Sequence, residues 1–233
     1  MKVKIDKDIL NKFPSLNMGI VVAKGVDNTG SDEKIYELLE EVEKLIQMNF
    51  VSEKLAENEM ISPWRAAYSE FGAKPSKYHN SVESLMRTVL KGKKIPKISK
   101  LVDLYNYLSL KHLVPMGADD LSKIEGDIKL KFAKGKEKFT PLGKTEKEEV
   151  DKGEVIYSDD KKVLCRKWNW RECDQSKITK DTQDVIIYIE GLFPVTKEKI
   201  IEVCKETVDL VQSFCGGKAT YQILNNELDN VKL

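Results

Sequence analysis

One stretch of this chain combines an interrupted helix with polar side chains that could serve a pocket. Residues 101–120 read LVDLYNYLSLKHLVPMGADD. Apolar residues recur there at helical spacing, and the same helix carries Asn106 and Ser109. Pro115 should end it, because proline has no N–H to donate and disfavours helical backbone in the preceding residue. The small residues around Gly117 then predict a turn that a ligand can approach, so we interpret the stretch as a pocket wall.

Two acids, Asp119 and Asp120, follow that turn. A carboxylate at either position would suit the ammonium group of an amino acid. The alternative is that these acids cap a short helical segment over 121–124, as aspartate often does. We take Asp119 and Asp120, together with Ser109, as candidate binding residues.

A second polar cluster lies at 168–171 and reads Trp-Asn-Trp-Arg. Two indoles that flank an amide, with a guanidinium next to them, could stack on a ring and bind a phosphate or a carboxylate. The alternative is a tryptophan packed in the core beside an arginine that faces solvent. We take Trp168, Asn169 and Arg171 as candidate binding residues, with Arg171 the best single candidate.

Charge is unevenly distributed along the chain, although the net charge is only +1. Residues 61–100 carry nine bases against two acids. Such a surface could contact phosphate groups, whereas the alternative is an ordinary solvated face of lysines. From this stretch we take Arg65, Lys74 and Arg87 as candidates for binding a tRNA backbone or a terminal carboxylate.

Composition narrows the class of protein. Of 233 residues, 41% are hydrophobic and 33% are charged, which is typical of a globular protein. No apolar run approaches the ~20 residues of a membrane span, and the start of the chain is too charged for a signal peptide, so we expect a cytoplasmic protein without a membrane partner. The four cysteines never adopt C-x-x-C spacing and only two histidines occur, so we expect reduced thiols, no metal and no cofactor.

The remaining pattern predicts a mixture of helices and strands. Helices should begin near residues 31, 62, 80, 101 and 194. Strands should cover 2–5 (as an edge strand), 18–23, 127–133, 154–157, 162–166, 184–192 and 219–224. No Walker loop or standard hydrolase motif occurs, so an enzyme built on this chain would rely on positioning and hydrogen bonds.

Several short motifs resemble one known family. Val-Asp-x-x-Asn-Tyr at 102–107 is followed by Pro-x-x-Ala-x-Asp at 115–120, and further matching segments lie at 123–128, 135–139 and 179–185. Together they resemble the tRNA-editing (B3/4) domain of the β subunit of phenylalanyl-tRNA synthetase, over residues 61–192. The catalytic and anticodon-binding parts of the synthetase are missing, so the chain looks like a free-standing copy of the editing domain.

The resemblance implies an α/β fold of the α+β type. Mixed or antiparallel sheet layers flanked by helices would form a single compact domain over 1–233. Residues 1–60 and 193–233 would then be extensions packed on the part that resembles the family.

The resemblance also implies site residues. Asn106 matches the family's pocket asparagine, although it could instead be satisfied by backbone inside the fold. Gly117 stands where the family usually has histidine, and Asp119 where it has phenylalanine. These departures make the pocket more acidic and put the family's preference for mischarged tyrosine in question. The late glutamate that reads the tyrosine hydroxyl matches Tyr188 or Glu190, so Asn106, Gly117 and Glu190 are candidate catalytic residues.

The leading hypothesis is therefore trans-acting hydrolysis of a mischarged aminoacyl-tRNA ester, with the aminoacylated 3′ end of tRNA as the partner. Backbone amides, Asn106 and the substrate's own ribose hydroxyl would orient the attacking water. One alternative is a non-catalytic RNA- or tRNA-binding module, which the missing histidine favours. Another is a binder or hydrolase of a free amino-acid derivative.

Overall fold

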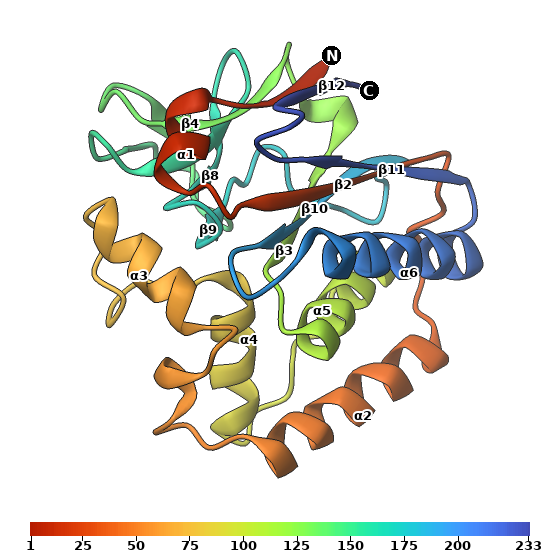
Figure 1. Cartoon of the computed structure of the whole chain (residues 1–233). Helices are drawn as coiled ribbons and strands as arrows, with labels where there is room; N and C mark the ends of the chain where they lie inside the picture. Colours follow the sequence, from red (N-terminus) through yellow and green to blue (C-terminus); the bar gives the residue numbers. More distant parts are fainter.

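The computed structural model describes residues 1–233 and stacks two sheets, with most of the helices beneath the lower one (Figure 1). The lower sheet has four strands in the order β11-β2-β10-β3, and all its neighbours are antiparallel. Its strands are β2 (Asn17–Lys24), β3 (Met116–Asp120), β10 (Asp184–Gly191) and β11 (Lys218–Leu224).

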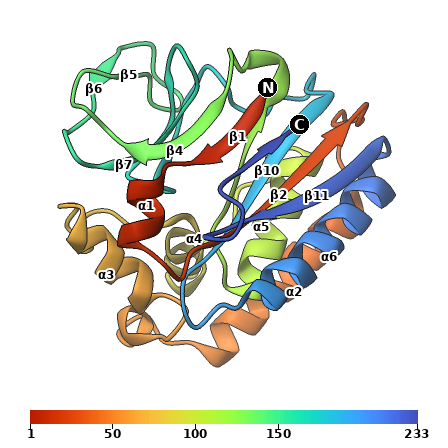
Figure 2. The ribbon, with the colours of Figure 1, turned by 45° about the horizontal axis from the view of Figure 1, so that its top comes forward.

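The upper sheet has six strands in the order β12-β1-β4-β7-β8-β9, and only β1 and β4 run parallel. Pairing of β1 with β12 brings the two ends of the chain together, as Figure 2 shows. These strands are β1 (Lys2–Ile5), β4 (Ile128–Phe132), β7 (Val155–Ser158), β8 (Val163–Arg166), β9 (Arg171–Glu172) and β12 (Asn230–Lys232). A separate small hairpin pairs β5 (Lys138–Phe139) with β6 (Glu148–Glu149).

Six α-helices complete the structure, and four of them begin with a side chain that accepts a backbone N–H at the N-cap. None of the helices combines the length and apolar character needed to cross a membrane. The helices are α1 (Lys7–Lys12), α2 (Glu33–Asn49), α3 (Ser62–Glu70), α4 (Ser81–Leu90), α5 (Lys100–His112) and α6 (Lys197–Cys215), with 3₁₀ turns η1 (Leu55–Glu57) and η2 (Leu121–Lys123).

Two hydrophobic cores follow from the strict alternation of side chains along the lower sheet. On one face of β10, Val185, Ile187 and Ile189 join a core of 32 buried residues shared with α2, α4, α5 and α6. On the opposite face, Ile186 and Tyr188 join a core of 24 buried residues between the sheets. The lower sheet is therefore buried on both faces, which explains why β10 reads as a nearly continuous apolar run.

The α+β class with mixed sheet layers flanked by helices is confirmed, whereas two local expectations are wrong. The segment 116–118 is part of strand β3 and not a turn, because it pairs with 187–189 of β10. Strand β1 is not at an edge, because the unpredicted strand β12 covers it. Strands β2 and β11, from the two ends of the chain, lie in the same sheet as β10, so these segments complete the sheet.

Candidate functional site

A cavity of about 190 Å³ lies where β3 and β10 of the lower sheet meet the segment 157–172 of the upper sheet. Strand β3 starts directly after Pro115, so the proline-terminated stretch and the Trp-Asn-Trp-Arg cluster line the same hollow. The sequence-predicted candidates among its lining residues are Gly117, Asp119, Trp168, Asn169, Arg171, Tyr188 and Glu190.

The floor of the cavity, which we define as Tyr157, Trp168, Asn169 and Glu190, is a closed hydrogen-bond network. The Glu190 carboxylate accepts bonds from Tyr157 Oη (2.5 Å), Trp168 Nε1 (2.6 Å) and Asn169 Nδ2 (2.8 Å). Asn169 Oδ1 in turn accepts from Tyr68 Oη at 2.9 Å, which ties helix α3 to the floor. Burial raises the pKa of Glu190, and the three donors act in the opposite direction. Both oxygens of Glu190 are thus occupied by the protein itself.

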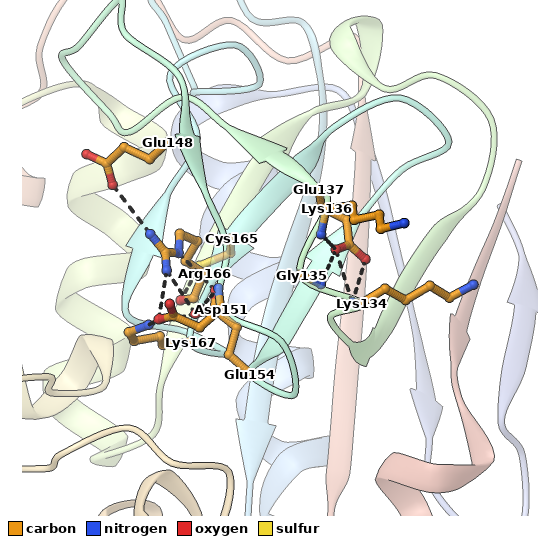
Figure 3. A network of polar contacts seen from close by, with 10 residues as sticks. All are labelled: Lys134, Gly135, Lys136, Glu137, Glu148, Asp151, Glu154, Cys165, Arg166 and Lys167. Atoms are coloured by element: carbon orange, nitrogen blue, oxygen red, sulfur yellow. Dashed lines mark hydrogen bonds and ion pairs between the residues drawn. The ribbon is translucent and has the colours of Figure 1, made fainter.

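Trp168 reaches the floor from a strained turn. Lys167 and Trp168 have φ values of 45° and 66°, a region that costs free energy for residues other than glycine. A neighbouring ionic network holds the turn: Lys167 Nζ pairs with Glu154 at 2.6 Å and Asp151 at 2.9 Å. Arg166 also pairs with Glu154, at 2.9 Å (Figure 3). These contacts fix the direction in which the turn presents Trp168.

The outer wall of the cavity, which we define as Gly117, Asp119 and Glu172, is acidic and carries few internal bonds. Asp119 accepts from Tyr188 Oη at 3.1 Å, and burial raises its pKa to about 6. Burial, and next the charge of Asp119, raise the pKa of Glu172 to about 7. Burial, and next the charges of Glu172 and Asp119, raise the pKa of Tyr105. The outer wall can therefore exchange protons near neutral pH.

We take the entrance of the cavity to lie at Trp170 and Arg171, two of its more exposed lining residues. Trp170 meets Tyr78 edge to face, with ring centroids 4.7 Å apart. Arg171 is exposed and lines the cavity. Ser81, the first residue of α4, also lines it, and its Oγ is shielded from solvent without a hydrogen-bond partner. An orphaned buried hydroxyl at the positive end of a helix is suited to donate a bond to a ligand oxygen.

Two of the arginines predicted to bind phosphate make ion pairs within the protein instead. Arg65 and Arg87 each pair with the fully buried Glu83 at 2.7 Å. They compensate that carboxylate, because a buried charge without a partner would be costly. Lys74 remains exposed and makes no ion pair. None of the three lines the cavity.

Three further candidates from the central stretch also lie outside the cavity lining. Ser109 Oγ donates to the carbonyl of Val114 at 2.7 Å and so satisfies the end of α5. Asp120 accepts a hydrogen bond from the backbone N–H of Ser122 at 2.9 Å and so caps the short helical turn η2. Asn106 lies partly exposed on α5.

Sequence reasoning missed Glu172, Tyr157 and Ser81 as cavity residues. Ser81 follows a recognisable helix cap at Asn80, but a cap does not show what lies in front of the helix. Glu172 sits in a short strand of two residues, so no alternation could assign its face. Tyr157 lies in a predicted strand, but its bond to Glu190 joins residues 33 positions apart.

Comparison with known proteins gives the family. Residues 63–216 match the B3/4 domain family. The phenylalanine–tRNA ligase beta subunit of Francisella tularensis subsp. tularensis is 27% identical over 212 residues, covering 85% of this chain and 26% of that subunit. The corresponding subunit of Acinetobacter baylyi is 36% identical over 95 residues, covering 41% of this chain and 12% of the subunit. The chain thus spans about a quarter of the length of the Francisella relative.

Solved structures match as well. One of them is an N-terminal fragment of the phenylalanyl-tRNA synthetase beta subunit from Pyrococcus horikoshii, with a TM-score of 0.47 and 16% identity. The alignment covers 93% of this chain and 49% of that one. Because the family match takes in more than half of its residues, this chain belongs to the B3/4 domain family.

Proposed function

We propose that this chain hydrolyses the ester bond of a mischarged aminoacyl-tRNA in trans. The observation that carries the proposal is the cavity itself, which brings Gly117, Asp119, Trp168 and Glu190 of the family-like motifs and the tryptophan cluster to one place. The relatives are subunits of a ligase that acts on tRNA, which supplies the substrate class.

The size of the cavity limits what enters it. A volume of about 190 Å³ is below the ~300 Å³ at which pockets for drug-sized ligands begin. The cavity therefore accepts the aminoacyl group, while the terminal adenosine stays at the entrance near Trp170 and Arg171. Stacking on the indole and contact with the guanidinium are the interactions by which proteins hold single-stranded nucleotide ends.

The polar groups suit an amino-acid ester. Asp119 lines the cavity, and the nearby Lys162 makes its ion pair with Asp159, so Asp119 can pair with the ammonium group of the aminoacyl moiety. Ser81 Oγ can donate to the ester carbonyl, whose oxygen gains negative charge during attack. The rigid Glu190 network fixes the shape of the floor and hence which side chains fit.

Incubating the purified chain with a panel of mischarged and correctly charged tRNAs tests the proposal. We expect amino-acid release above the uncatalysed rate from at least one mischarged species. Asp119→Asn should weaken release, and Glu53→Gln, an exposed acid outside the cavity, serves as the control. Release no faster than the uncatalysed rate from every species would overturn the proposal. Equal turnover of a short aminoacyl-adenosine would instead favour a hydrolase of free amino-acid derivatives.

A non-catalytic tRNA-binding role is the second candidate, because the cavity contains no histidine. It predicts salt-dependent binding of uncharged tRNA, since neutralised phosphates release counterions. Lys91 and Lys93 are exposed and unpaired, whereas the neighbouring Lys94 pairs with Glu43 at 3.0 Å. Replacing Lys91 and Lys93 by alanine should lower the slope of log affinity against log salt by about 2, because each lost phosphate contact removes about 1. Lys205→Ala on the exposed side of α6 is the matched control.

A further inference from the structure

Several ionisable groups line the cavity, and one of them, Glu172, receives no hydrogen bond from another side chain. Neither histidine of the chain lines it: His112 pairs with Glu206 at 2.7 Å, and His79 lies beside Glu83. A proton acceptor for hydrolysis must therefore come from the acids or from Cys165. Burial raises the pKa of the Cys165 thiol well above its usual range, so it stays protonated.

Among the three carboxyl groups, Glu172 is the least occupied by the protein. Glu190 accepts three side-chain hydrogen bonds, and Asp119 accepts one from Tyr188. Glu172 receives no side-chain hydrogen bond, and only the backbone of Ala118 acts to lower its pKa. Its oxygens are thus the ones left for a water molecule or a substrate.

Gly117 gives the Glu172 carboxylate its position. A Cβ built on residue 117 would lie 3.0 Å from Glu172 Oε1, closer than about nine in ten real contacts of this kind, so the carboxylate would have to move by a few tenths of an ångström. The carboxylate therefore occupies space into which any side chain at position 117 would project. The absence of a side chain on Gly117 leaves Glu172 at the cavity surface and next to Asp119.

Burial and then the charge of Asp119 raise the pKa of Glu172, and two further titratable groups face it. Asp119 approaches from β3 and Tyr105 from α5, while Cys165 lies opposite in the β8–β9 register. No cation contributes to its pKa of about 7, and the neighbouring Arg171 is exposed. A carboxyl group whose pKa is raised to about 7 can take up and release a proton near neutral pH, which is the condition for an efficient general base.

We propose that Glu172 is the general base of the hydrolysis, an inference that depends on the deacylase function proposed above. Its carboxylate takes one proton from a water molecule while the water oxygen forms a bond to the ester carbonyl carbon. As the bond from that carbon to the ribose oxygen breaks, the protonated carboxyl returns the proton to the ribose oxygen. The products are a free amino acid and a tRNA with an intact terminal hydroxyl, and Glu172 is again ionised.

Replacing Glu172 with glutamine tests this role, because the amide keeps the size of the side chain but cannot accept the proton. Using the mischarged tRNA that the wild type hydrolyses, we expect kcat to fall at least 100-fold while KM changes less than threefold. At saturating substrate the wild-type kcat should fall tenfold for each pH unit below about 7, and this fall should be absent from Glu172→Gln.

Two further measurements keep the test decisive. Binding of a non-hydrolysable 3′-aminoacylamido-adenosine, followed by calorimetry, should be unchanged in Glu172→Gln, which shows that the cavity is intact. Glu53→Gln should retain wild-type rates at every pH. A Glu172→Gln enzyme with kcat within threefold of wild type, or with the same pH dependence, overturns the general-base role and leaves the deacylase function standing. A wild-type chain that releases no amino acid from any tRNA overturns both.

Discussion

The floor and the outer wall of the cavity contain the same chemical group in opposite surroundings. On the floor, Glu190 is almost completely buried and accepts three hydrogen bonds. On the outer wall, Glu172 is partly exposed and accepts none from a side chain. A carboxylate saturated with donors stabilises a structure, whereas an unsaturated one is free to bind or transfer protons. We infer that the floor shapes the site and that the outer wall performs its chemistry.

Removing the two glutamates separately should give the largest contrast. Glu190→Ala leaves three buried donors without their acceptor, and each such loss costs about 1–3 kcal/mol. We expect the free energy of unfolding to fall by about 4 kcal/mol, measured by urea denaturation. Glu172→Ala removes no comparable bond and, measured at pH 5 where the folded protein keeps this carboxyl protonated, should change it by less than about 1 kcal/mol. Equal losses in the two variants would contradict the division between floor and outer wall.

The pH dependence of the free energy of unfolding should report the raised pKa of Asp119 in the outer wall. The folded state raises the pKa of Asp119 from 3.8 to about 6, so it binds a proton more tightly than the unfolded state. The resulting stabilisation is complete below about pH 4 and is lost as pH rises through 6. At 1.36 kcal/mol per pKa unit, this amounts to about 3 kcal/mol.

The matched variant for that measurement is Asp119→Asn, which cannot titrate. Urea denaturation at a series of pH values from 4 to 7 measures the free energy of unfolding. We expect this free energy to decline less with rising pH in the variant than in the wild type. Parallel curves would mean that Asp119 titrates normally and that burial does not raise its pKa.

The contact between residues 117 and 172 should give a small coupling energy in a double-mutant cycle on the free energy of unfolding. Gly117→Ala forces the Glu172 carboxylate to shift, because its Oε1 would lie 3.0 Å from the new methyl group. The same substitution in a Glu172→Ala background meets no such obstacle. The double-mutant cycle should therefore give a coupling energy of about 1 kcal/mol, as residues in contact typically do. Additive effects would show that Gly117 is not what positions the carboxylate.

Helices and strands could be predicted from the sequence better than the pairing between strands. Segments with a strong apolar pattern, such as α4 and β10, were predicted within a few residues, because α4 buries one face and β10 buries both, and the apolar residues of each reflect that burial. The short β12 and α1 were missed, since three and six residues carry too little pattern. The turn predicted at 116–118 is a strand because pairing with β10 outweighs the local preference of its small residues.

Residues of the candidate cavity could be predicted only where a motif supplied them. The family pattern and the tryptophan cluster led to Gly117, Trp168 and Glu190, which the structure places in one cavity. The charge run did not reveal that two of its bases, Arg65 and Arg87, pair with the buried Glu83, because only one of those pairs is visible as an i,i+4 spacing. Glu172 could not be predicted as a cavity residue, because it lies beside Gly117, which is 55 positions earlier in the sequence.

The smallest expected effect concerns Asn106, the one candidate catalytic residue outside the cavity lining. It makes no side-chain hydrogen bond and lies partly exposed on α5, so Asn106→Ala removes no contact to the floor or the outer wall. We expect the deacylation rate to change less than twofold, measured with the same charged tRNA as for Glu172→Gln. A loss as large as that of Glu172→Gln would show that α5 contributes directly to the reaction. The outer wall would then have to be extended to include that helix, and proton transfer could no longer be assigned to Glu172 alone.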